Sequence, residues 1–528
     1  MSATKMIKAI SKIRLLLAAM VAMALLLPAT AHGAAPGITG PAFALTAQPA
    51  YISQPDGSMI YSWGYGCTTP GTAHTFAPAA PMPGATCPSM QVPGPTLIVT
   101  EGQTVTVTLT NGLPTSAGNT SILFPGFQVT STLGVSGLLT QEAAPGGTVT
   151  YTFTAGTPGT RAYYSGTQGD LQVEMGLYGA IIVLPSGTPT GCTAVGSVPA
   201  HYLPEADFRL ASAAYDHAKS CYDREYLFQF SEIDPVIHSR AQVQVAAKTG
   251  CVAGAAGCSL NVATEPYHPA YFLINGRSMP DDMDPNYAVE YPHQPYNGNP
   301  HMHPGEQVLL RVIGQGRWQH PFHEHGNHVR ILGRDGNIIL SQTDPSNNLA
   351  GPLLFTTTTT PGQAMDGIFY WTAKGLNWDA YGHNPASADP LATLPCTPDA
   401  NGYNTGAPTA LNYYEWCQDH NKPMQAAPFG DVAGGGPTTL PDANIFANGA
   451  WFGGSPYLGP NATVRATGPT GTTPPSGTIA NSPTGEAGFA FMWHSHNERE
   501  ITTNNIFPGG MLMMMLVDSR EFVIDESN

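Results

Sequence analysis

The stretch Pro95-Thr-Leu-Ile-Val-Thr-Glu-Gly-Gln-Thr-Val-Thr-Val-Thr-Leu-Thr110 decides the fold class of this chain. Two β-rich runs flank a turn at Glu101-Gly102, and the second run alternates Thr with Val or Leu, which is the pattern of a half-buried strand. Further strands are predicted at 148–154 and 178–184. Short strands at this spacing predict an antiparallel β-sandwich over 41–187.

A second block, over 222–520, repeats this layout at larger size. Pro304-Gly305-Glu306 opens a predicted strand much as Glu101-Gly102 does, and Pro361-Gly362 precedes another as Pro145-Gly146-Gly147 does in the first block. The strands predicted in this block are 225–230, 271–274, 307–313 and 368–371. The repeat predicts two copies of one sandwich. A Gly/Pro/Asn-rich insertion at about 375–485 interrupts the second copy, either as an ordered cover or as a disordered segment.

Composition agrees with an all-β protein. Charged residues make up only 11% of the chain, Gly and Pro number 59 and 49, and no long helix is predicted. The net charge of −16 argues against nucleic acid and anionic membranes as partners.

The N-terminus resembles a secretory signal peptide. Four basic residues up to Arg14 precede an apolar run, 15–27, and the small-residue stretch Ala29-Thr-Ala31 predicts cleavage after residue 31. We therefore expect an exported protein in the periplasm, at a cell surface or in the medium, with no membrane insertion after cleavage. Retention of 1–31 as an anchor is the alternative.

The eight cysteines all follow this segment, and their even number fits disulfides. Sequential pairing is the expectation: Cys67 with Cys87, Cys192 with Cys221, Cys251 with Cys258, and Cys396 with Cys417. No cysteine lies near the histidine clusters in the sequence.

Two short histidine clusters carry the candidate chemistry. They are His320-Pro-Phe-His323-Glu-His325 and Trp493-His494-Ser495-His496. Residues i and i+2 of a strand share a face, so two adjacent strands would gather His323, His325, His494 and His496. Four imidazoles suit copper, zinc, iron or nickel. The alternative is a set of hydrogen-bonded histidines lining a polar cleft.

Several phrases, in order along the chain, resemble the multicopper oxidase family of cupredoxin β-sandwich proteins. They are Val92-Pro-Gly-Pro-Thr96 with Glu101-Gly102, Gly176-Leu-Tyr-Gly-Ala180, Phe272-Leu-Ile-Asn-Gly276, His320-Pro-Phe-His-Glu-His-Gly326, and His494-Ser-His496 followed by Gly510-Met511. Because each block occurs once, the layout of the chain is closest to that of the two-domain members of the family. The resemblance thus implies two cupredoxin-like Greek-key sandwiches, a possible homotrimer, and copper as cofactor.

The same resemblance implies that several copper ligands are missing. Leu123-Phe-Pro-Gly126 and Tyr163-Tyr-Ser-Gly166 stand where the family has two histidines each. Ser495 stands at the thiolate of the mononuclear copper, and a hydroxyl cannot replace that ligand. Glu500 stands at another of its histidines, whereas His320 keeps its position.

What remains by resemblance is half of a three-copper cluster: His323, His325, His494 and His496. One ion of copper, or of zinc, iron or manganese, is expected there, with His320, Glu500 or Glu324 as additional candidate ligands.

Other candidates have simpler interpretations. Tyr163 and Tyr164 are expected as fillers, with redox-active phenols facing the histidines as the alternative. Met511, Met513 and Met515 are expected in a core strand rather than at a cuprous site. His301 and His303 are expected at the surface, with a weak second metal site as the alternative.

Three functions therefore stay open. The first is metal binding or altered redox chemistry without laccase activity, the second an oxidoreductase completed by a partner subunit, and the third a structural or cell-surface protein that reuses the fold. The incomplete copper sites leave it undecided from the sequence whether the chain is an enzyme.

Overall fold

The computed structural model describes residues 34–80, 82–197, 205–372, 397–400, 402–406, 454–457, 488–518 and 524. The predicted signal peptide and most of the predicted insertion lie outside these residues.

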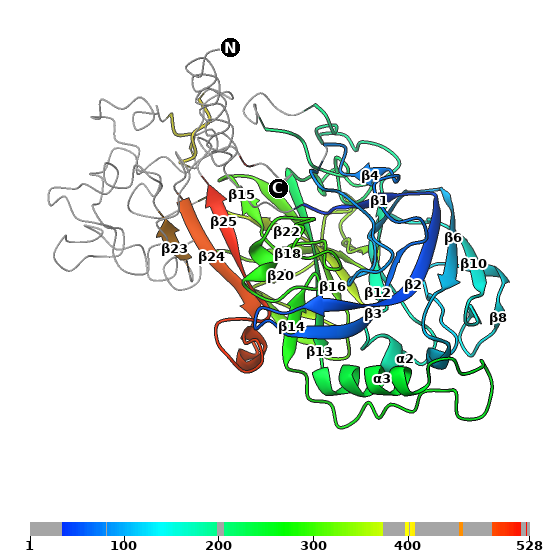
Figure 1. The fold of residues 1–528 in the computed structure, drawn as a ribbon. Helices are drawn as coiled ribbons and strands as arrows, with labels where there is room; N and C mark the ends of the chain where they lie inside the picture. The colour runs from blue at the N-terminus through cyan, green and yellow to red at the C-terminus, as the bar shows by residue number, and fades with distance from the viewer. Residues whose placement is uncertain are drawn as a thin grey trace, which may run out of the picture.

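Two five-stranded sheets face each other in the first part of the chain (Figure 1). In spatial order, one contains β11 (Gly159–Tyr164), β12 (Tyr178–Leu184), β5 (Leu97–Thr100), β1 (Gly37–Thr39) and β4 (Phe76–Ala77). The other contains β3 (Met59–Cys67), β2 (Ala42–Ser53), β6 (Thr104–Asn111), β10 (Thr148–Thr154) and β7 (Thr130–Leu133). Leu97 and Ile181 from the first sheet and Val107 from the second are fully buried in one core. The alternating Thr residues of β6 lie on its outer, less buried face, as the sequence pattern predicts.

Two larger sheets form a second sandwich. One is ordered β14 (Tyr271–Ile274), β13 (Arg224–Ile233), β16 (Gln307–Gly314), β22 (Ala364–Tyr370), β18 (Val329–Arg334) and β19 (Asn337–Ile338), with β20 (Leu353–Leu354) on β18. The other is ordered β15 (His301–Met302), β25 (Leu512–Asp518), β24 (Gly488–Ser495), β17 (His320–Glu324) and β21 (Thr356–Thr359), with β23 (Gly454–Tyr457) on β24. Phe228, Phe322 and Trp493 are among the buried side chains that fill the space between the two sheets. A minor hairpin, β8 (Val135–Ser136) with β9 (Gln141–Glu142), lies at the far side of the first sandwich.

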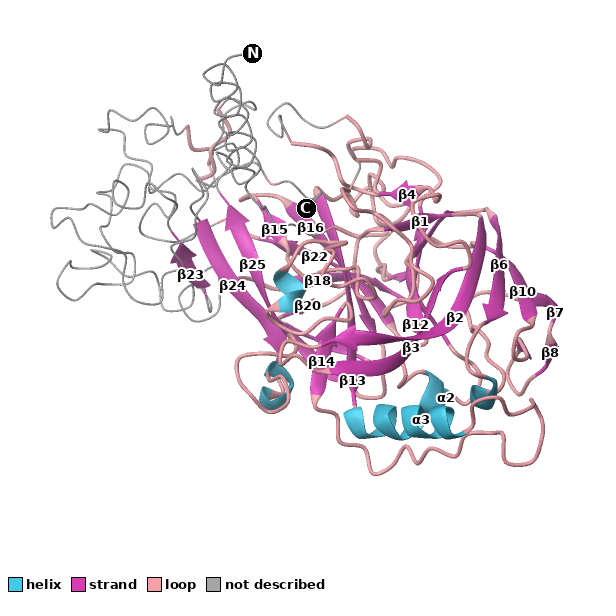
Figure 2. Cartoon of the chain, viewed as in Figure 1, coloured by secondary structure: helices cyan, strands magenta, loops and turns pink. Residues whose placement is uncertain are grey.

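The internal repeat read from the sequence has a structural counterpart. β6 and β10 pair antiparallel in the first sandwich, and β16 and β22 pair antiparallel in the second. The described residues are mostly strands and loops (Figure 2), so the predicted all-β class with cupredoxin-like sandwiches is confirmed.

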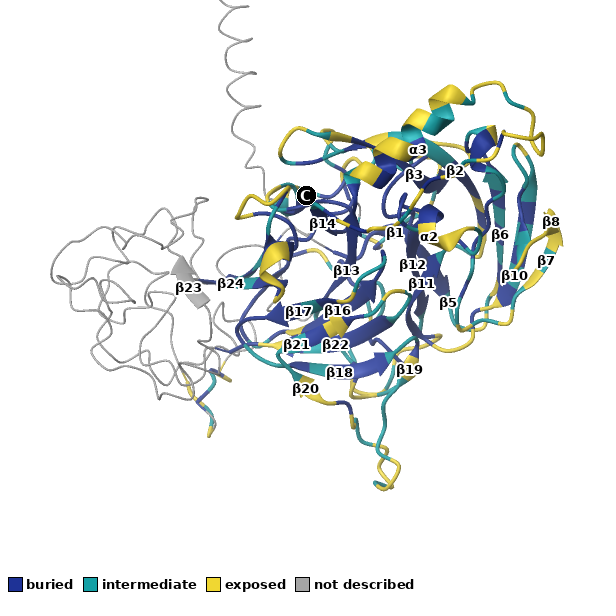
Figure 3. Ribbon diagram, turned by 90° about the horizontal axis from the view of Figure 1, so that it is seen from below, coloured by how far each residue is buried: buried dark blue, intermediate teal, exposed yellow. Residues whose placement is uncertain are grey.

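The helix α3 (Pro235–Ala247) was not expected from composition. Its start does carry a local signal, because Asp234 accepts a 2.9 Å hydrogen bond from the Val236 amide and Pro235 occupies the first turn. Figure 3 shows the helix with a buried side toward β3 and an exposed side toward solvent. The other helical segments are short: α2 (Gly169–Gln172), η1 (Thr115–Ala117), η3 (Asp281–Met283) and η5 (Glu498–Ile501). None of the helices in the described ranges has the length and apolar character to cross a membrane.

Three of the four expected disulfides are present: Cys67–Cys87, Cys192–Cys221 and Cys251–Cys258. Cys396 and Cys417 lie outside the described residues.

Buried ionic groups join the two sandwiches. Arg311 of β16 lies 2.7 Å from the Glu225 carboxylate and donates a 3.0 Å hydrogen bond to the Thr160 hydroxyl of β11. Asp366 of β22 accepts hydrogen bonds from the Thr160 hydroxyl at 2.6 Å and from the Tyr215 hydroxyl at 2.7 Å. Because each charged group here has a partner, the contact avoids the cost of an isolated buried charge.

Candidate metal centre

Four histidine side chains meet at the adjoining ends of β17 and β24. His323 and His494 are direct partners in this antiparallel pair, and His325 and His496 lie one residue beyond the two strand ends. The His323 ring centroid is 4.9 Å from that of His325, 5.6 Å from that of His494 and 4.8 Å from that of His496. The structure therefore gathers the four imidazoles as strand periodicity predicted.

Hydrogen bonds to the outer nitrogens orient two of these rings. The Nδ1 of His494 lies 2.7 Å from the Ser495 carbonyl oxygen, which can only accept, so Nδ1 carries the proton and Nε2 presents its lone pair. The Nδ1 of His323 lies 2.7 Å from the Thr356 hydroxyl. Partners of this kind fix the ring orientation of metal-binding histidines.

The inner nitrogens of His494 and His325 are close enough to share an ion. Their Nε2 atoms lie 3.2 Å apart. Two nitrogens that each bind one ion at about 2.0–2.1 Å are separated by about 2.9–3.4 Å for bond angles between about 90° and 110°. The same separation is that of an N–H···N hydrogen bond, which joins the two rings when no ion lies between them.

The cluster favours uncharged imidazoles. Burial, together with smaller contributions from the three neighbouring histidines, lowers the pKa of His323 to about 4. Burial also lowers the pKa of His494. Near neutral pH both rings are therefore in the form that binds metal ions.

One side of the cluster reaches solvent. His323, His325 and His494 are buried, whereas the side chain of His496 is 55% exposed and its Nδ1 lies 3.9 Å from a carboxylate oxygen of Glu498. A cation would thus approach along His496.

His320 and Glu500 lie in a separate, fully buried cluster. The His320 Nδ1 is 2.8 Å from Glu500 Oε2, and its Nε2 is 2.9 Å from Glu232 Oε2. Glu500 also accepts a 2.5 Å hydrogen bond from the Ser495 hydroxyl. Both ring nitrogens of His320 are therefore bound to carboxylates, and neither is directed to the four-histidine cluster.

These carboxylates keep His320 protonated. Burial alone would lower the pKa of this imidazole, but hydrogen bonds and charge attraction from Glu232 and Glu500 raise it to about 9. At neutral pH the ring is a cation held between the two glutamate side chains.

Glu324 lies on the opposite face of β17 from His323, because consecutive residues of a strand point to opposite sides. It is fully buried, accepts a 2.9 Å hydrogen bond from the Thr357 hydroxyl, and burial raises its carboxyl pKa well above the usual value. It is a core group rather than a fifth member of the cluster.

Tyr163 fills the first-sandwich core. Its hydroxyl donates to the Pro95 carbonyl at 2.7 Å, and its ring packs against Phe124 at 5.9 Å. The adjacent Tyr164 pairs with Leu123 through backbone hydrogen bonds of 2.7 and 3.3 Å. Tyr163 is therefore a core residue, as expected of a filler, and the segments 123–126 and 163–166 lie side by side.

Two other sequence interpretations have clear outcomes. Met511, Met513 and Met515 are fully buried in the second core, as expected. The expectation that His301 and His303 are surface residues was wrong, because both are buried.

Buried acids surround these two histidines. His301 Nδ1 lies 2.6 Å from the Asp518 carboxylate, and His303 Nε2 lies 2.6 Å from Glu205. His303, Glu205 and Glu306 place ligand atoms within 4.8 Å of one another. Arg224, however, pairs with both Glu205 and Glu306, so a guanidinium already supplies the positive charge that a metal ion would bring.

Sequence reasoning missed two residues that orient the histidines. Glu232, a partner of His320, is the second-last residue of β13, in which every residue is buried. An acid in such a strand signals a buried cation nearby. Thr356, the partner of His323, belongs to a run of threonines in β21 that pairs along β17. That pairing joins residues more than 30 positions apart, so no local pattern contained it.

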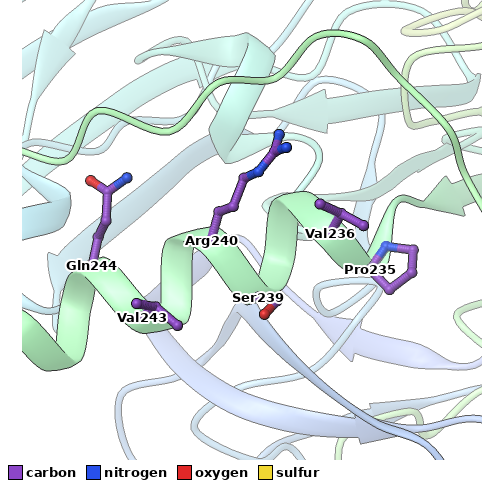
Figure 4. A pocket seen from close by; sticks show the side chains of 6 residues that line it. All are labelled: Pro235, Val236, Ser239, Arg240, Val243 and Gln244. Carbon is purple, nitrogen blue, oxygen red and sulfur yellow. The ribbon is translucent and has the colours of Figure 1, made fainter.

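A shallow groove on the outer face of α3 lies apart from this site (Figure 4). Its lining residues are Pro235, Val236, Ser239, Arg240, Val243 and Gln244. None of these side chains is a histidine, cysteine or carboxylate, so the groove offers no metal ligands of those types.

Comparison with known proteins agrees with the sequence motifs. Residues 84–188 match the sequence model of a family described as multicopper oxidase. Similar solved structures include the multicopper oxidase mgLAC, with 15% identity, a TM-score of 0.43, and 90% of this chain and 86% of that chain covered. Another is the blue copper oxidase from Nitrosomonas europaea, with 15% identity, a TM-score of 0.42, and coverages of 90% and 85%. The copper nitrite reductase of that organism has 19% identity, a TM-score of 0.35, and coverages of 63% and 84%.

These structural similarities are too low to transfer a function. No curated protein sequence matches the chain. The family match covers the segment with both family-like phrases of the first sandwich, so the resemblance to the multicopper oxidase family is confirmed there.

Proposed function

We propose that this chain is an exported, multicopper-oxidase-like protein that binds one metal ion through His323, His325, His494 and His496, and that it has no laccase activity. The observation that carries the proposal is the convergence of four imidazoles in which the Nε2 atoms of His325 and His494 lie 3.2 Å apart. The depressed pKa values of His323 and His494 support it, because the neutral rings are ready to bind.

Copper is the preferred ion. Neutral imidazole binds divalent copper more tightly than the other first-row ions, and zinc, iron and manganese are the alternatives. A bound copper ion would supply a centre that changes oxidation state. The chain itself supplies the ring orientation through Ser495 and Thr356, and an entry side through the exposed His496.

The residues that stand at the family's mononuclear copper position support the absence of laccase activity. Three residues stand there by resemblance, and two of them, His320 and Ser495, both contact the third, Glu500. They offer a protonated imidazole, a hydroxyl and a carboxylate, with no thiolate to form the electron-accepting copper bond. In the first sandwich, Phe124 and Tyr163 fill core positions within the two segments that carry histidines in the family, and neither segment contains a histidine.

The test is the metal content per mature chain after copper reconstitution and desalting, by elemental mass spectrometry. We expect about one ion in the wild type, a colourless sample, and loss of that ion in the His325→Ala/His496→Ala variant. His268→Ala is the matched control, because its side chain is exposed and its backbone amide donates to Asp234, which is not a member of the cluster. Phenol oxidation with three or four ions would mean a near-complete oxidase, completed by ligands from a partner. Equal metal content in all variants would favour a structural role.

Export and assembly belong to the same proposal. Three disulfides among the described residues support export into an oxidising compartment. Assembly as a trimer is what the resemblance implies, and light scattering of the mature protein tests it directly.

A further inference from the structure

Another set of metal-ligand atoms, distinct from the four histidines and from the His303 group, lies in the first sandwich. Cys67 and Cys87 form a disulfide, and His74 Nδ1 lies 3.9 Å from the Cys67 sulfur. One ligand atom from each of the three residues lies within 4.8 Å of the others. As a disulfide, the two sulfurs are poor ligands, because the thiolate is the form that binds metals.

The His74 ring already presents a lone pair to these sulfurs. Its Nε2 lies 2.8 Å from the Thr69 carbonyl oxygen, which can only accept, so Nε2 carries the proton. Nδ1 is therefore the unprotonated nitrogen, and it faces Cys67. A ring fixed by a backbone carbonyl on its far side is the usual arrangement of a metal-binding histidine.

The two cysteines are held together by more than the disulfide. The Cys67 amide donates to the Pro88 carbonyl at 2.8 Å, next to Cys87. Cys87 exchanges two backbone hydrogen bonds with Gly71, at 2.9 and 3.0 Å. Both side chains are buried, with 1% exposure each. Reduction would therefore leave the two sulfur atoms beside each other, because these backbone contacts do not depend on the S–S bond.

We propose that reduction of Cys67–Cys87 converts this disulfide into a binding site for one thiophilic ion, Cu⁺ or Zn²⁺, with His74 as the third ligand. An ion bound to sulfur at about 2.3 Å and to imidazole nitrogen at about 2.0–2.1 Å separates those atoms by about 3.6 Å at a tetrahedral angle. The observed 3.9 Å is close to this value. Two thiolates and one imidazole suit both ions.

A phosphine, with water, can reduce the Cys67–Cys87 disulfide. The phosphine gives two electrons to the S–S bond and becomes a phosphine oxide with oxygen from water. The two protons of that water convert the sulfurs to thiols. Binding of the ion then releases these two protons to solvent, so uptake weakens as pH falls.

The experiment compares oxidised and phosphine-reduced protein in the His325→Ala/His496→Ala background, under nitrogen and after removal of the phosphine. Zinc binding is measured by competition with a chromogenic chelator, and cuprous binding likewise. Cobalt replaces zinc to report thiolate ligation through its near-ultraviolet charge-transfer band. We expect one additional ion after reduction and at least about tenfold weaker binding in His74→Ala.

Two controls separate this site from the other cysteines freed by reduction. His268→Ala is expected to bind like its parent, and Cys67→Ser/Cys87→Ser to lose the additional ion while its circular dichroism stays that of a folded protein. Equal affinity in His74→Ala and its parent would overturn the proposal, as would unfolding of the chain on reduction or absence of the charge-transfer band. Because both the oxidised and the reduced protein carry His325→Ala and His496→Ala, the result of this experiment does not depend on the four-histidine proposal.

Discussion

The buried pair of carboxylates around His320 predicts a specific dependence of stability on pH. The imidazole has both nitrogens bound to acids and a pKa of about 9 in the folded chain, against about 6.5 for an unperturbed histidine. A group whose pKa is raised on folding contributes its full stabilisation below the unfolded value. That contribution is lost as the pH rises through the folded value.

The magnitude follows from the interval between the two pKa values. At about 1.4 kcal/mol per pH unit, the range from about 6.5 to about 9 corresponds to about 3.5 kcal/mol of unfolding free energy. Other groups titrate in the same range, because burial raises the pKa of Glu174 and of Asp518 to about 8, and their contributions also fall as the pH rises. The pH dependence of the unfolding free energy of the wild type alone is therefore not diagnostic of His320. The difference in unfolding free energy between the wild type and a variant is needed.

The difference between wild type and His320→Gln isolates the imidazole. The neutral amide keeps a donor but never carries the positive charge, so its cost is largest when wild-type His320 is protonated. We expect the stability gap between the two apoproteins, from urea unfolding at pH 6 to 9.5, to shrink by about 3 kcal/mol across that range. A gap that stays constant with pH would refute the reasoning, because the pKa of His320 would then be the same in the folded and the unfolded chain.

Three further predictions concern stability and metal retention. Arg311→Met leaves Glu225 and Asp366 buried without their cation and lowers the unfolding free energy by about 3–5 kcal/mol, measured by urea unfolding. Asp234→Ala removes the cap of α3 and costs about 0.5–2 kcal/mol, with little change in far-ultraviolet circular dichroism. Because the pKa of His323 is about 4, equilibrium dialysis is expected to find metal retained at pH 5.5 and released toward pH 4; release centred near pH 6.5 would contradict it.

Local periodicity was enough to predict most strands. The Thr/Val alternation after Glu101-Gly102 became β6, and the predicted strands 148–154, 178–184 and 271–274 have the observed bounds. These patterns work because one face of each strand must be buried, which the sequence records at every second residue. The helix α3 was missed because composition is an average over 528 residues and hides one 13-residue element.

The candidate site was predictable only in part, for a related reason. The i, i+2 spacing of His323 with His325, and of His494 with His496, is local, and the register of β17 on β24 then joins the pairs. Burial of His303 was not predictable, because it results from Glu205, which lies 98 positions away in sequence. Residues as far apart as His303 and Glu205 leave no periodic pattern in the sequence. The only local signal was Pro304-Gly305, which wrongly indicated a surface turn.

The network at Ser495 gives His320 a role in this fold that needs no copper ion. The Ser495 hydroxyl and the His320 imidazole both donate to Glu500 Oε2, so the carboxylate is satisfied by one neutral and one positively charged donor. Removal of His320 would leave Glu232 and Glu500 as two buried carboxylates without this cation between them, which costs more than loss of a single hydrogen bond. Charge balance alone thus accounts for a buried imidazole at residue 320, and its presence does not argue for a mononuclear copper.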